Sequence, residues 1–432
     1  MNTHKHVSLN LNIRGLAQST TIAINDLSRQ RQGEGKEVYR LGLGQSPFPV
    51  PQPVVNALKH HAHQKDYLPA KGLLALRQAV ADYHRRHDAI QLNAEHVLIG
   101  PGSKELMFLL QLVYYGELVV ATPCWVSYVP QANIIGRRVR LIPTRYEDNW
   151  RLTAEQFERF CKREEDDLRP RILLMNYPGN PEGGTYSAGE LEQIANVARQ
   201  YQVVLLSDEI YGQLHHNGTH VSVARFYPEG TIISSGLSKW CGAGGWRLGT
   251  FAFPNELDWL CESMAAVASE TFTSVSAPIQ YAAIRAFKGG TAIERYLWHS
   301  RRILSTLAQR IVGVLRQGGI RVHDPEGAFY LFLDFSLLTD KLGKRGIADS
   351  VTLCDRLIEE TGVAILPGVS FNRDETELTA RLAYVDFDGA RALTASETIP
   401  LDQPLPDEFT DTYCYKVIRA VQLLVEWLDQ SQ

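Results

Sequence analysis

The sequence predicts an α/β fold: a large, mostly parallel mixed sheet covered by helices on both faces, followed by a smaller α/β unit. Two observations carry this prediction. Between about residues 90 and 255, short apolar runs alternate with segments of helical periodicity, and this alternation is typical of a parallel sheet that is buried on both sides. After about residue 290, one long helical pattern leads to a second group of short apolar runs.

The apolar runs of the first part are predicted to be buried strands because each is short and nearly free of polar residues. They are HVLIG (96–100), ELVVAT (117–122), RILLMN (171–176), VVLLSD (203–208), TIISS (231–235) and RLGTFAF (247–253). Two segments between them, 103–115 and 187–201, have helical periodicity. Ser187, followed by Glu190 three residues later, is typical of a capping box at the start of the second helix.

The C-terminal part is predicted to form the smaller unit, which we expect the N-terminal segment to complete. Its helices are expected at 292–317 and 348–361, and its strands at GIRVH (319–323), AFYLFLDF (328–335) and LTARLAY (378–384). The Pro- and acid-rich residues 386–412 indicate a long surface loop before a final helix over 413–430. EEDD at 164–167 is expected to be a solvated turn.

Composition limits the class of protein. The chain of 432 residues is 44% hydrophobic and 21% charged, which is typical of a soluble enzyme with a large core. Its formal net charge of −4 gives no basic surface for nucleic acid, and no apolar run reaches the length of a membrane span. The N-terminus lacks the apolar centre of a signal peptide, and the six scattered cysteines form no CxxC pair. We therefore expect a cytoplasmic protein with reduced thiols and no nucleic-acid or membrane partner.

Polar residues follow several predicted strands, at the edge where such sheets bind ligands. PGSKE forms a Gly-Ser turn that opens a helix, so its N–H groups and Ser103 suit a phosphate, although an ordinary capped helix has the same pattern. Trp125 follows the next strand and is either a stacking platform or a core residue. Asn180, in YPGNPEGG, can donate its amide into the cleft, but plain loops use the same residue types.

Two further strands add charged groups to this edge. Asp208, in DEIYG, ends an apolar strand, and a carboxylate buried there requires a cationic or protonated partner. Tyr211 follows three residues later. The next strand leads to Ser238, Lys239 and Arg247, and the intervening GAGG lets the chain bend back into the cleft. Individually these residues are ordinary, but together they predict one site.

Two other kinds of site are not expected. GAGGWRLG does not match G-x-G-x-x-G, because the third glycine is misplaced and a strand follows instead of a helix, so no dinucleotide site is expected. The histidines at 60, 61, 63, 215 and 216 lack acid-flanked metal spacing and lie among polar residues. We expect them to be exposed and assign no metal.

In their order and spacing, NYPGNPEGG, SDEIYG and LSKWCGAGGWRLG resemble the motifs of the fold-type-I, class I/II aminotransferases that depend on pyridoxal 5′-phosphate (PLP). Within them, the chain is most similar to the aspartate aminotransferase-like branch. The match runs from STTIAIND near the N-terminus to Arg381. The resemblance implies PLP as cofactor, an N-terminal segment (1–50) packed with the small domain, a large PLP-binding domain (51–290) and a small C-terminal domain (291–432).

The resemblance also implies roles for the residues at the strand ends. Lys239 resembles the lysine that forms the internal aldimine with PLP, and Asp208 resembles the carboxylate that pairs with the pyridine nitrogen. Tyr211 and Asn180 resemble the donors to the ring phenolate oxygen. Lys239, Asp208 and Tyr211 are thus the implied catalytic residues.

Further positions match the cofactor and substrate contacts of the family. Trp125 is similar to the aromatic residue that stacks on the ring, with Ile210 on the other face. Tyr67 resembles the tyrosine that reaches the phosphate of the neighbouring subunit, which implies a homodimer. The implied phosphate contacts are Gly102, Ser103, Lys104, Ser238 and Arg247. The implied substrate contacts are Gly44, Trp125, Asn180 and Arg381, with Arg381 as the clamp for the α-carboxylate.

The chain departs from the family pattern in three places. Glu182 replaces the usual threonine of the asparagine-proline turn, and Gly236 replaces a hydroxyl residue often seen three positions before the lysine. One phosphate contact is therefore expected to be missing. The loop at 386–412 is longer than the family's usual run into the last helix. These departures bear most on substrate specificity.

The implied reaction is transamination of an L-amino acid with a 2-oxo acid by a ping-pong mechanism. A dicarboxylic, aspartate-like donor with 2-oxoglutarate as acceptor is favoured, because Lys104 matches a lysine that helps one subgroup recognise the distal carboxylate. Lys104 could equally add charge only near the phosphate. The alternatives are an aromatic or other amino-acid aminotransferase, or a carbon–sulfur β-lyase on the same fold. A PLP-binding regulatory module is a third hypothesis, but it usually requires an added DNA-binding domain, for which the N-terminus is too short.

Overall fold

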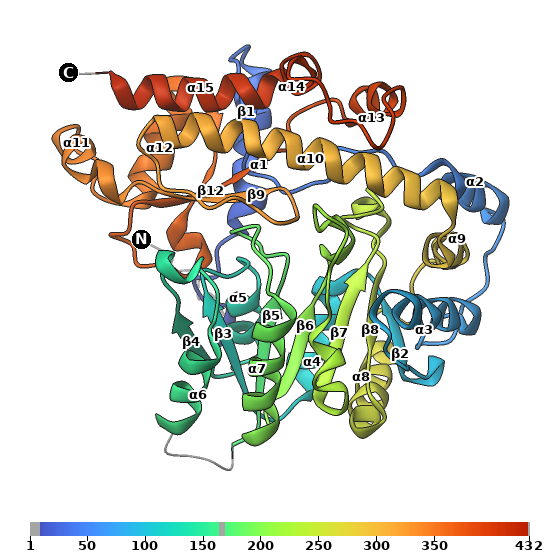
Figure 1. The fold of residues 1–432 in the computed structure, drawn as a ribbon. Coiled ribbons are helices and arrows are strands. Elements are labelled where there is room, and N and C mark those ends of the chain that lie inside the picture. Colours follow the sequence, from blue (N-terminus) through green and yellow to red (C-terminus); the bar gives the residue numbers. More distant parts are fainter. Residues whose placement is uncertain (1–8, 164–168, 431–432) are drawn as a thin grey trace, which may run out of the picture.

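The computed structural model describes residues 9–163 and 169–430, and its centre is a seven-stranded sheet with the order β2-β8-β7-β6-β5-β3-β4 (Figure 1). The strands are β2 (Val97–Gly100), β3 (Glu117–Thr122), β4 (Val139–Pro143), β5 (Arg171–Asn176), β6 (Val204–Asp208), β7 (Thr231–Gly236) and β8 (Gly249–Ala252). The pairs from β4 to β7 are parallel, whereas β8 is antiparallel to both of its neighbours. This mostly parallel sheet confirms the predicted fold class.

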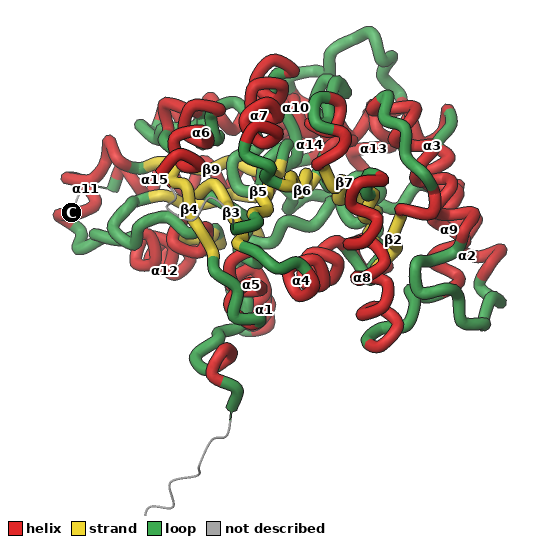
Figure 2. The backbone as a smooth tube through the Cα atoms, turned by 90° about the horizontal axis from the view of Figure 1, so that it is seen from below, coloured by secondary structure: helices red, strands yellow, loops and turns green. Residues whose placement is uncertain are grey.

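Helices cover both faces of this sheet (Figure 2). One face is covered by α4 (Ser103–Val113), α5 (Tyr128–Ile134) and α8 (Asp258–Glu270), whose apolar side chains form one buried cluster with the strands. The opposite face carries α6 (Ala154–Arg163) and α7 (Ala188–Gln200) in a second cluster. The capping box at Ser187 and Glu190 is present, as predicted. Beside β2, α2 (Gln52–His61), α3 (Leu74–Asp88) and α9 (Ala277–Lys288) pack together.

The ends of the chain combine in the smaller unit. Strand β1 (Tyr39–Arg40) pairs in parallel with β10 (Val363–Ala364), so the N-terminal segment joins the C-terminal part as expected. A three-stranded antiparallel sheet has the order β11 (Leu366–Pro367), β12 (Thr379–Ala383), β9 (Tyr330–Asp334). The helices of this unit are α1 (Thr20–Gly33), α10 (Thr291–Gln317), α11 (Thr339–Lys344), α12 (Ser350–Thr361) and α15 (Tyr415–Asp429).

Two sequence-based expectations for the elements were wrong or incomplete, and a third is not tested. GIRVH forms only an isolated bridge between Arg321 and Asp334, because the run is too short and too close to the end of α10 to extend into a strand. Strand β4 was missed because its burial is mixed rather than continuous. EEDD at 164–167 lies outside the described residues.

The stretch 386–412 is not a long loop. It contains α13 (Gly389–Glu397) and, at its end, α14 (Glu408–Tyr413). The Asp388 side chain caps α13 by accepting hydrogen bonds from two backbone N–H groups, and Ala392 and Leu393 are buried beneath it. The prolines and acids flanking this short helix hid its apolar face in the sequence. Within the described ranges, no helix is long and apolar enough to cross a membrane.

Candidate active site

Strand register brings three polar residues into one row at the carboxyl edge of the large sheet. Asn176 on β5 stands opposite Asp208 on β6, and Asp208 stands opposite Ser234 on β7. A cavity of about 550 Å³ opens at this edge, where parallel sheets bind ligands. The following predicted site residues line it: Gly44, Ser103, Lys104, Trp125, Asn180, Asp208, Ile210, Tyr211, Ser238, Lys239, Arg247 and Arg381.

Asp208 is the buried acid of the site. One carboxylate oxygen accepts a hydrogen bond of 2.6 Å from the Tyr128 hydroxyl, and the other accepts one of 3.2 Å from Ser234. Asn176 donates to the Asp208 backbone carbonyl over 2.8 Å, which fixes the strand end. Burial raises the pKa of Asp208 to about 6, while the bonds from Tyr128 and Ser234 act in the opposite direction. The carboxylate is therefore oriented, but no cation within residues 9–163 and 169–430 forms an ion pair with it, although a buried carboxylate requires one.

Lys239 follows β7 and projects into the same cavity. Its Nζ donates a hydrogen bond of 2.6 Å to the Gly44 carbonyl and lies 5.5 Å from the centroid of the Tyr211 ring. Burial lowers the pKa of Lys239 to about 7, and the nearby Arg381 cation adds to the effect. A substantial fraction of this amine is consequently neutral and nucleophilic at neutral pH.

One end of the cavity suits a phosphate group. Helix α4 begins at Ser103, and Gly102 before it has a positive φ of 95°. A Cβ on Gly102 would lie 2.1 Å from Nη2 of Arg247, so only glycine lets the guanidinium approach the helix start this closely. Free N–H groups of a helix N-terminus, two basic side chains and the hydroxyls of Ser103 and Ser238 make an anion site.

Gly236 was expected to leave a gap near this anion site. A Cβ there would instead lie 2.7 Å from the Leu248 carbonyl oxygen and 3.0 Å from the Gly249 Cα. Glycine is therefore required by the close approach of β7 and β8, and the position has no room for a hydroxyl side chain.

The opposite end of the cavity is built around Arg381, which is 1% exposed. Its guanidinium donates to Oδ1 of Asn180 over 3.0 Å and to the Gly42 carbonyl. The same group lies between the rings of Tyr330 and Phe371, at 4.8 and 5.0 Å from their centroids. No carboxylate neutralises it, and its buried Nε has no partner among the described residues. This cation is prepared for an anion from outside.

Two predicted site residues are not part of the cavity lining. Gly102 stands behind the lining and supports Arg247. Tyr67 is 90% exposed and does not line the cavity. Four residues that hold the predicted ones in place were not predicted from the sequence: Asn176, Tyr128, Ser234 and Tyr330. The final asparagine of RILLMN and the tyrosine three positions after Trp125 were the available signals.

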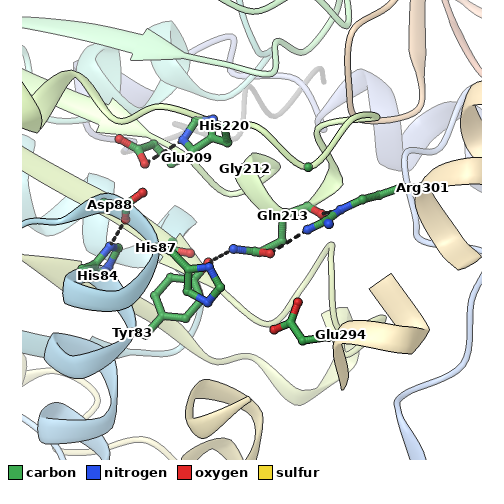
Figure 3. Close-up of a pocket in the computed structure, with 12 residues that line it drawn as sticks. Tyr83, His84, His87, Asp88, Glu209, Gly212, Gln213, His220, Glu294 and Arg301 are labelled. Carbon is green, nitrogen blue, oxygen red and sulfur yellow. Dashed lines mark hydrogen bonds and ion pairs between the residues drawn. The ribbon is translucent and has the colours of Figure 1, made fainter. Parts of the chain in front are cut away.

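A second, smaller polar cavity of about 100 Å³ is lined by Glu209 and Ser235, the chain neighbours of Asp208 and Ser234 (Figure 3). It contains two imidazole–carboxylate pairs, His84 with Asp88 at 2.8 Å and His220 with Glu209 at 2.9 Å. The two cavities share no lining residue. The His220–Glu209 pair joins the segment that follows Tyr211 to the residue after β6, whereas His84 and Asp88 pair with each other within α3.

The expectation of exposed histidines was wrong for His215 and His216, which are 7% and 9% exposed. Their backbones join the Gly327 region by a bridge and a hydrogen bond, which covers both side chains. Burial lowers the pKa of each to about 4, so both are neutral at pH 7. Among residues 9–163 and 169–430, no group of three His, Cys, Asp or Glu side chains could hold a metal ion.

The large cavity fits PLP by the chemistry of its donors. Asp208 is a buried carboxylate without a cation, as a protonated pyridine nitrogen requires. Lys239 supplies an amine that is neutral in part at neutral pH. Trp125 and Ile210 offer apolar faces, and the start of α4 with Arg247 offers a phosphate cradle.

Comparisons with known proteins agree with this geometry. Residues 36–384 match the family Aminotransferase class I and II. An aspartate aminotransferase of Bacillus sp. (strain YM-2) is 31% identical over 384 residues, covering 86% of this chain and 93% of that protein. An asparagine–oxo-acid transaminase of Streptococcus mutans is 29% identical, covering 85% and 92% of the two chains. The structure of Thermus thermophilus aspartate aminotransferase with maleate has a TM-score of 0.80 at 28% identity, covering 90% and 98%.

The family match spans most of the chain, and the relatives are covered almost completely. The same chain presents a lysine, a buried aspartate and a phosphate cradle in one cavity. The chain therefore belongs to the class I and II aminotransferases and is a PLP-dependent aminotransferase.

Proposed function

We propose that this enzyme transfers the amino group of a dicarboxylic, aspartate-like L-amino acid to a 2-oxo acid such as 2-oxoglutarate. The observation that carries the proposal is that two cations, Arg381 and Lys104, line the cavity in addition to Lys239 and Arg247, which the cofactor would occupy. Lys104 Nζ lies 5.0 Å from the centroid of the Trp125 ring, and no carboxylate is paired with it in the described part of the chain. Two cations suit a substrate with two carboxylates. The names of the aspartate and asparagine relatives, and the maleate complex, support this choice.

When bound, PLP supplies an electron sink for the carbanion that forms at the substrate Cα. The chain provides the base. Lys239 would hold the cofactor through its amine and, once released, take and return the proton at Cα. Its depressed pKa, about 7, favours this role, because a base whose pKa is near the working pH is both available and reactive.

The acid at the other end of the ring would be Asp208. A fixed negative charge beside the pyridine nitrogen keeps that nitrogen protonated, and the protonated ring is the deeper electron sink. Tyr128 and Ser234 orient the carboxylate from both sides, so its geometry does not depend on the cofactor. Tyr211 and Asn180 would donate to the ring phenolate oxygen, and Trp125 and Ile210 would enclose the ring.

The phosphate would be held at the start of α4 by Ser103, Ser238 and Arg247. At the other end, Arg381 would bind the substrate α-carboxylate, assisted by Asn180 and the Gly44 backbone. A bidentate guanidinium–carboxylate contact fixes the Cα–H bond relative to the ring, which favours proton removal by Lys239.

Three further assignments belong to this proposal. The chain would divide into an N-terminal segment (1–50), a large domain (51–290) and a small domain (291–432). It would form a homodimer in which Tyr67, 90% exposed in one subunit, reaches the phosphate of the neighbouring site. It would work in the cytoplasm, in accord with six cysteines that are all buried.

The specificity proposal is tested with Lys104→Gln. We expect kcat/KM for L-aspartate to fall roughly 10- to 100-fold, which is the usual effect of losing a hydrogen bond to a charged group. The value for L-phenylalanine should change by less than about twofold, because that side chain makes no ionic contact. Lys341→Gln, which removes an exposed ion pair with Asp429 far from the cavity, is the matched control. An equal loss for both substrates would assign Lys104 to the phosphate and overturn the specificity proposal.

A further inference from the structure

Two buried tyrosines meet beside Lys239. The hydroxyls of Tyr211 and Tyr330 are 2.7 Å apart, within hydrogen-bond distance, and the two rings are perpendicular, with an interplanar angle of 85°. Tyr211 is 3% and Tyr330 is 1% exposed. The two come from different parts of the fold, because Tyr211 follows β6 of the large sheet and Tyr330 begins β9 of the three-stranded sheet.

The Tyr330 side chain is held tightly. A Cβ on Gly44 would lie 1.9 Å from the Tyr330 hydroxyl oxygen, so this hydroxyl rests directly against the Gly44 backbone. The Arg381 guanidinium covers the ring, 4.8 Å from its centroid. Tyr211 is the hydrogen-bond partner of the Tyr330 hydroxyl in the described structure. Tyr330 therefore has little freedom to leave Tyr211.

Only one arrangement of the two hydroxyl protons lets Tyr211 donate a hydrogen bond into the cavity while it stays bonded to Tyr330. Each tyrosine hydroxyl has one proton to donate and can accept from other donors. When the Tyr211 proton points to an anionic oxygen in the cavity, it is no longer available to Tyr330. The contact of 2.7 Å then persists only if the Tyr330 hydroxyl donates to the Tyr211 oxygen. A hydroxyl that accepts one hydrogen bond is polarised into a stronger donor of another.

We propose that Tyr330 is a positioning residue: it donates a hydrogen bond to the Tyr211 hydroxyl and so directs the Tyr211 proton onto the phenolate oxygen of the cofactor ring. This inference rests on the proposed role of Tyr211 as a donor to that oxygen. The Arg381 guanidinium over the Tyr330 ring strengthens the arrangement, because a nearby cation makes the phenol a better donor.

A consequence follows for the bound cofactor. A hydrogen bond to the phenolate oxygen would favour the deprotonated form of the lysine-bound cofactor, because that oxygen carries its full negative charge only in the deprotonated form. Removing the Tyr330 hydroxyl should weaken that stabilisation and move the pH midpoint of the cofactor's visible absorbance upward. The shift should be smaller than that caused by removing the Tyr211 hydroxyl, because Tyr330 acts only through Tyr211.

The experiment is a pH titration of the visible absorbance of the purified holoenzyme, without substrate, for Tyr330→Phe, Tyr211→Phe and the double variant. We expect Tyr330→Phe to raise the midpoint by about half a pH unit, a roughly threefold change in proton affinity, and Tyr211→Phe to raise it by about one unit. In the double variant, the midpoint should equal that of Tyr211→Phe alone. Tyr384→Phe is the matched control, because Tyr384 is fully buried in the same unit and its hydroxyl makes only a long contact of 3.4 Å.

The outcomes separate this inference from the assignment on which it rests. If Tyr211→Phe leaves the midpoint unchanged, the role of Tyr211 itself is wrong. If Tyr211→Phe shifts the midpoint but Tyr330→Phe does not, only the positioning role of Tyr330 is overturned. A shift in Tyr330→Phe that persists undiminished in the double variant, or that Tyr384→Phe reproduces, also overturns it, because the effect then does not pass through Tyr211.

Discussion

The two walls of the active site are completed in different ways. On the wall formed by the large sheet, both carboxylate oxygens of Asp208 accept hydrogen bonds, from Tyr128 and Ser234. On the wall formed by the three-stranded sheet, Arg381 is buried against two aromatic rings, and no carboxylate of the described residues pairs with it. The chain alone therefore orients the Asp208 carboxylate of the first wall, whereas the Arg381 guanidinium of the second wall keeps an uncompensated positive charge.

This difference matches the order in which ligands are used. The cofactor stays with the enzyme, so a rigid wall that holds its ring in one orientation is advantageous. The substrate is exchanged in every half-reaction, so its α-carboxylate should supply the missing charge each time. Lys239 lies between the walls. Its backbone follows β7 of the first wall, and its amine donates a hydrogen bond to the Gly44 carbonyl near the second wall.

Removing the amine between the walls should have the largest effect. In Lys239→Ala, we expect kcat to fall by about 10³-fold or more, because general acid–base catalysis and attachment of the cofactor are lost together. The visible absorbance of the lysine-bound cofactor should also disappear. Addition of methylamine should restore part of the rate. Substantial activity in Lys239→Ala without an added amine would contradict the assignment.

Substitution of Arg381 in the second wall should have the next largest effect. Arg381→Leu removes the uncompensated cation, and we expect kcat/KM for every amino acid to fall roughly 100-fold, the equivalent of losing one strong charge-assisted bond or two weaker ones. Affinity for PLP, measured by equilibrium dialysis, should change less than twofold. A large loss of PLP affinity would show that the two walls are not independent.

A smaller effect is expected where the first wall loses one of its two donors. Burial raises the pKa of Asp208 to about 6, and the hydrogen bond from Tyr128 opposes that rise. In Tyr128→Phe, the pKa of Asp208 should therefore increase, and the acid limb of the pH–kcat profile should move to higher pH by about one unit or less. Tyr114→Phe, whose hydroxyl makes a 3.4 Å contact away from the cavity, is the control. An unchanged or downward-shifted acid limb would contradict the orienting role.

The pH dependence of apoenzyme stability distinguishes Lys239 from a surface lysine. Its pKa is lowered by burial to about 7 in the folded chain, against 10.5 for the ordinary side chain. Between these values the unfolded chain binds more protons, so the free energy of unfolding should rise with pH over that window. Lys239→Met should remove this increase in a series of urea titrations from pH 7 to pH 10. The same slope in both proteins would argue against a buried amine.

The smallest effect concerns Glu182, which lies under the Asn180 turn. Burial raises its pKa to about 8 from 4.5, so the folded chain binds more protons between these values and its stability falls as pH rises. Glu182→Gln, which stays neutral, should match the wild type near pH 5 and become more stable than it up to pH 8. Equal melting temperatures at pH 8 would contradict the burial of this carboxyl group.

The two walls also differ in how far the sequence revealed them. The first wall follows from strand ends: an apolar run that stops at Asp208, or a turn that starts a helix at Ser103, shows both the element and its polar edge. The residues that orient Asp208 were missed, because Ser234 lies inside a strand and Tyr128 begins a helix. The register of β6 with β7 places Ser234 beside Asp208, and α5 on one face of the sheet places Tyr128 there.

The second wall depends on contacts across the fold, which local patterns do not encode. Arg381 meets Asn180 across 201 positions of sequence, and Tyr330 meets Tyr211 across 119. The role of Arg381 came from family resemblance, and Tyr330 was not identified at all. Helix α13 was missed for a local reason: it is nine residues long and its flanks are rich in proline and acids.

The central claim, that this cavity performs transamination on a dicarboxylic amino acid, is tested most directly by a single half-reaction. L-Aspartate is added to the PLP-loaded enzyme without any 2-oxo acid, and the cofactor spectrum and the released products are followed together. We predict conversion of the bound cofactor to its amine form, with one equivalent of oxaloacetate per active site and no ammonia. Continuous release of ammonia with a 2-oxo acid, or no spectral change with aspartate while an aromatic amino acid reacts, would contradict the account.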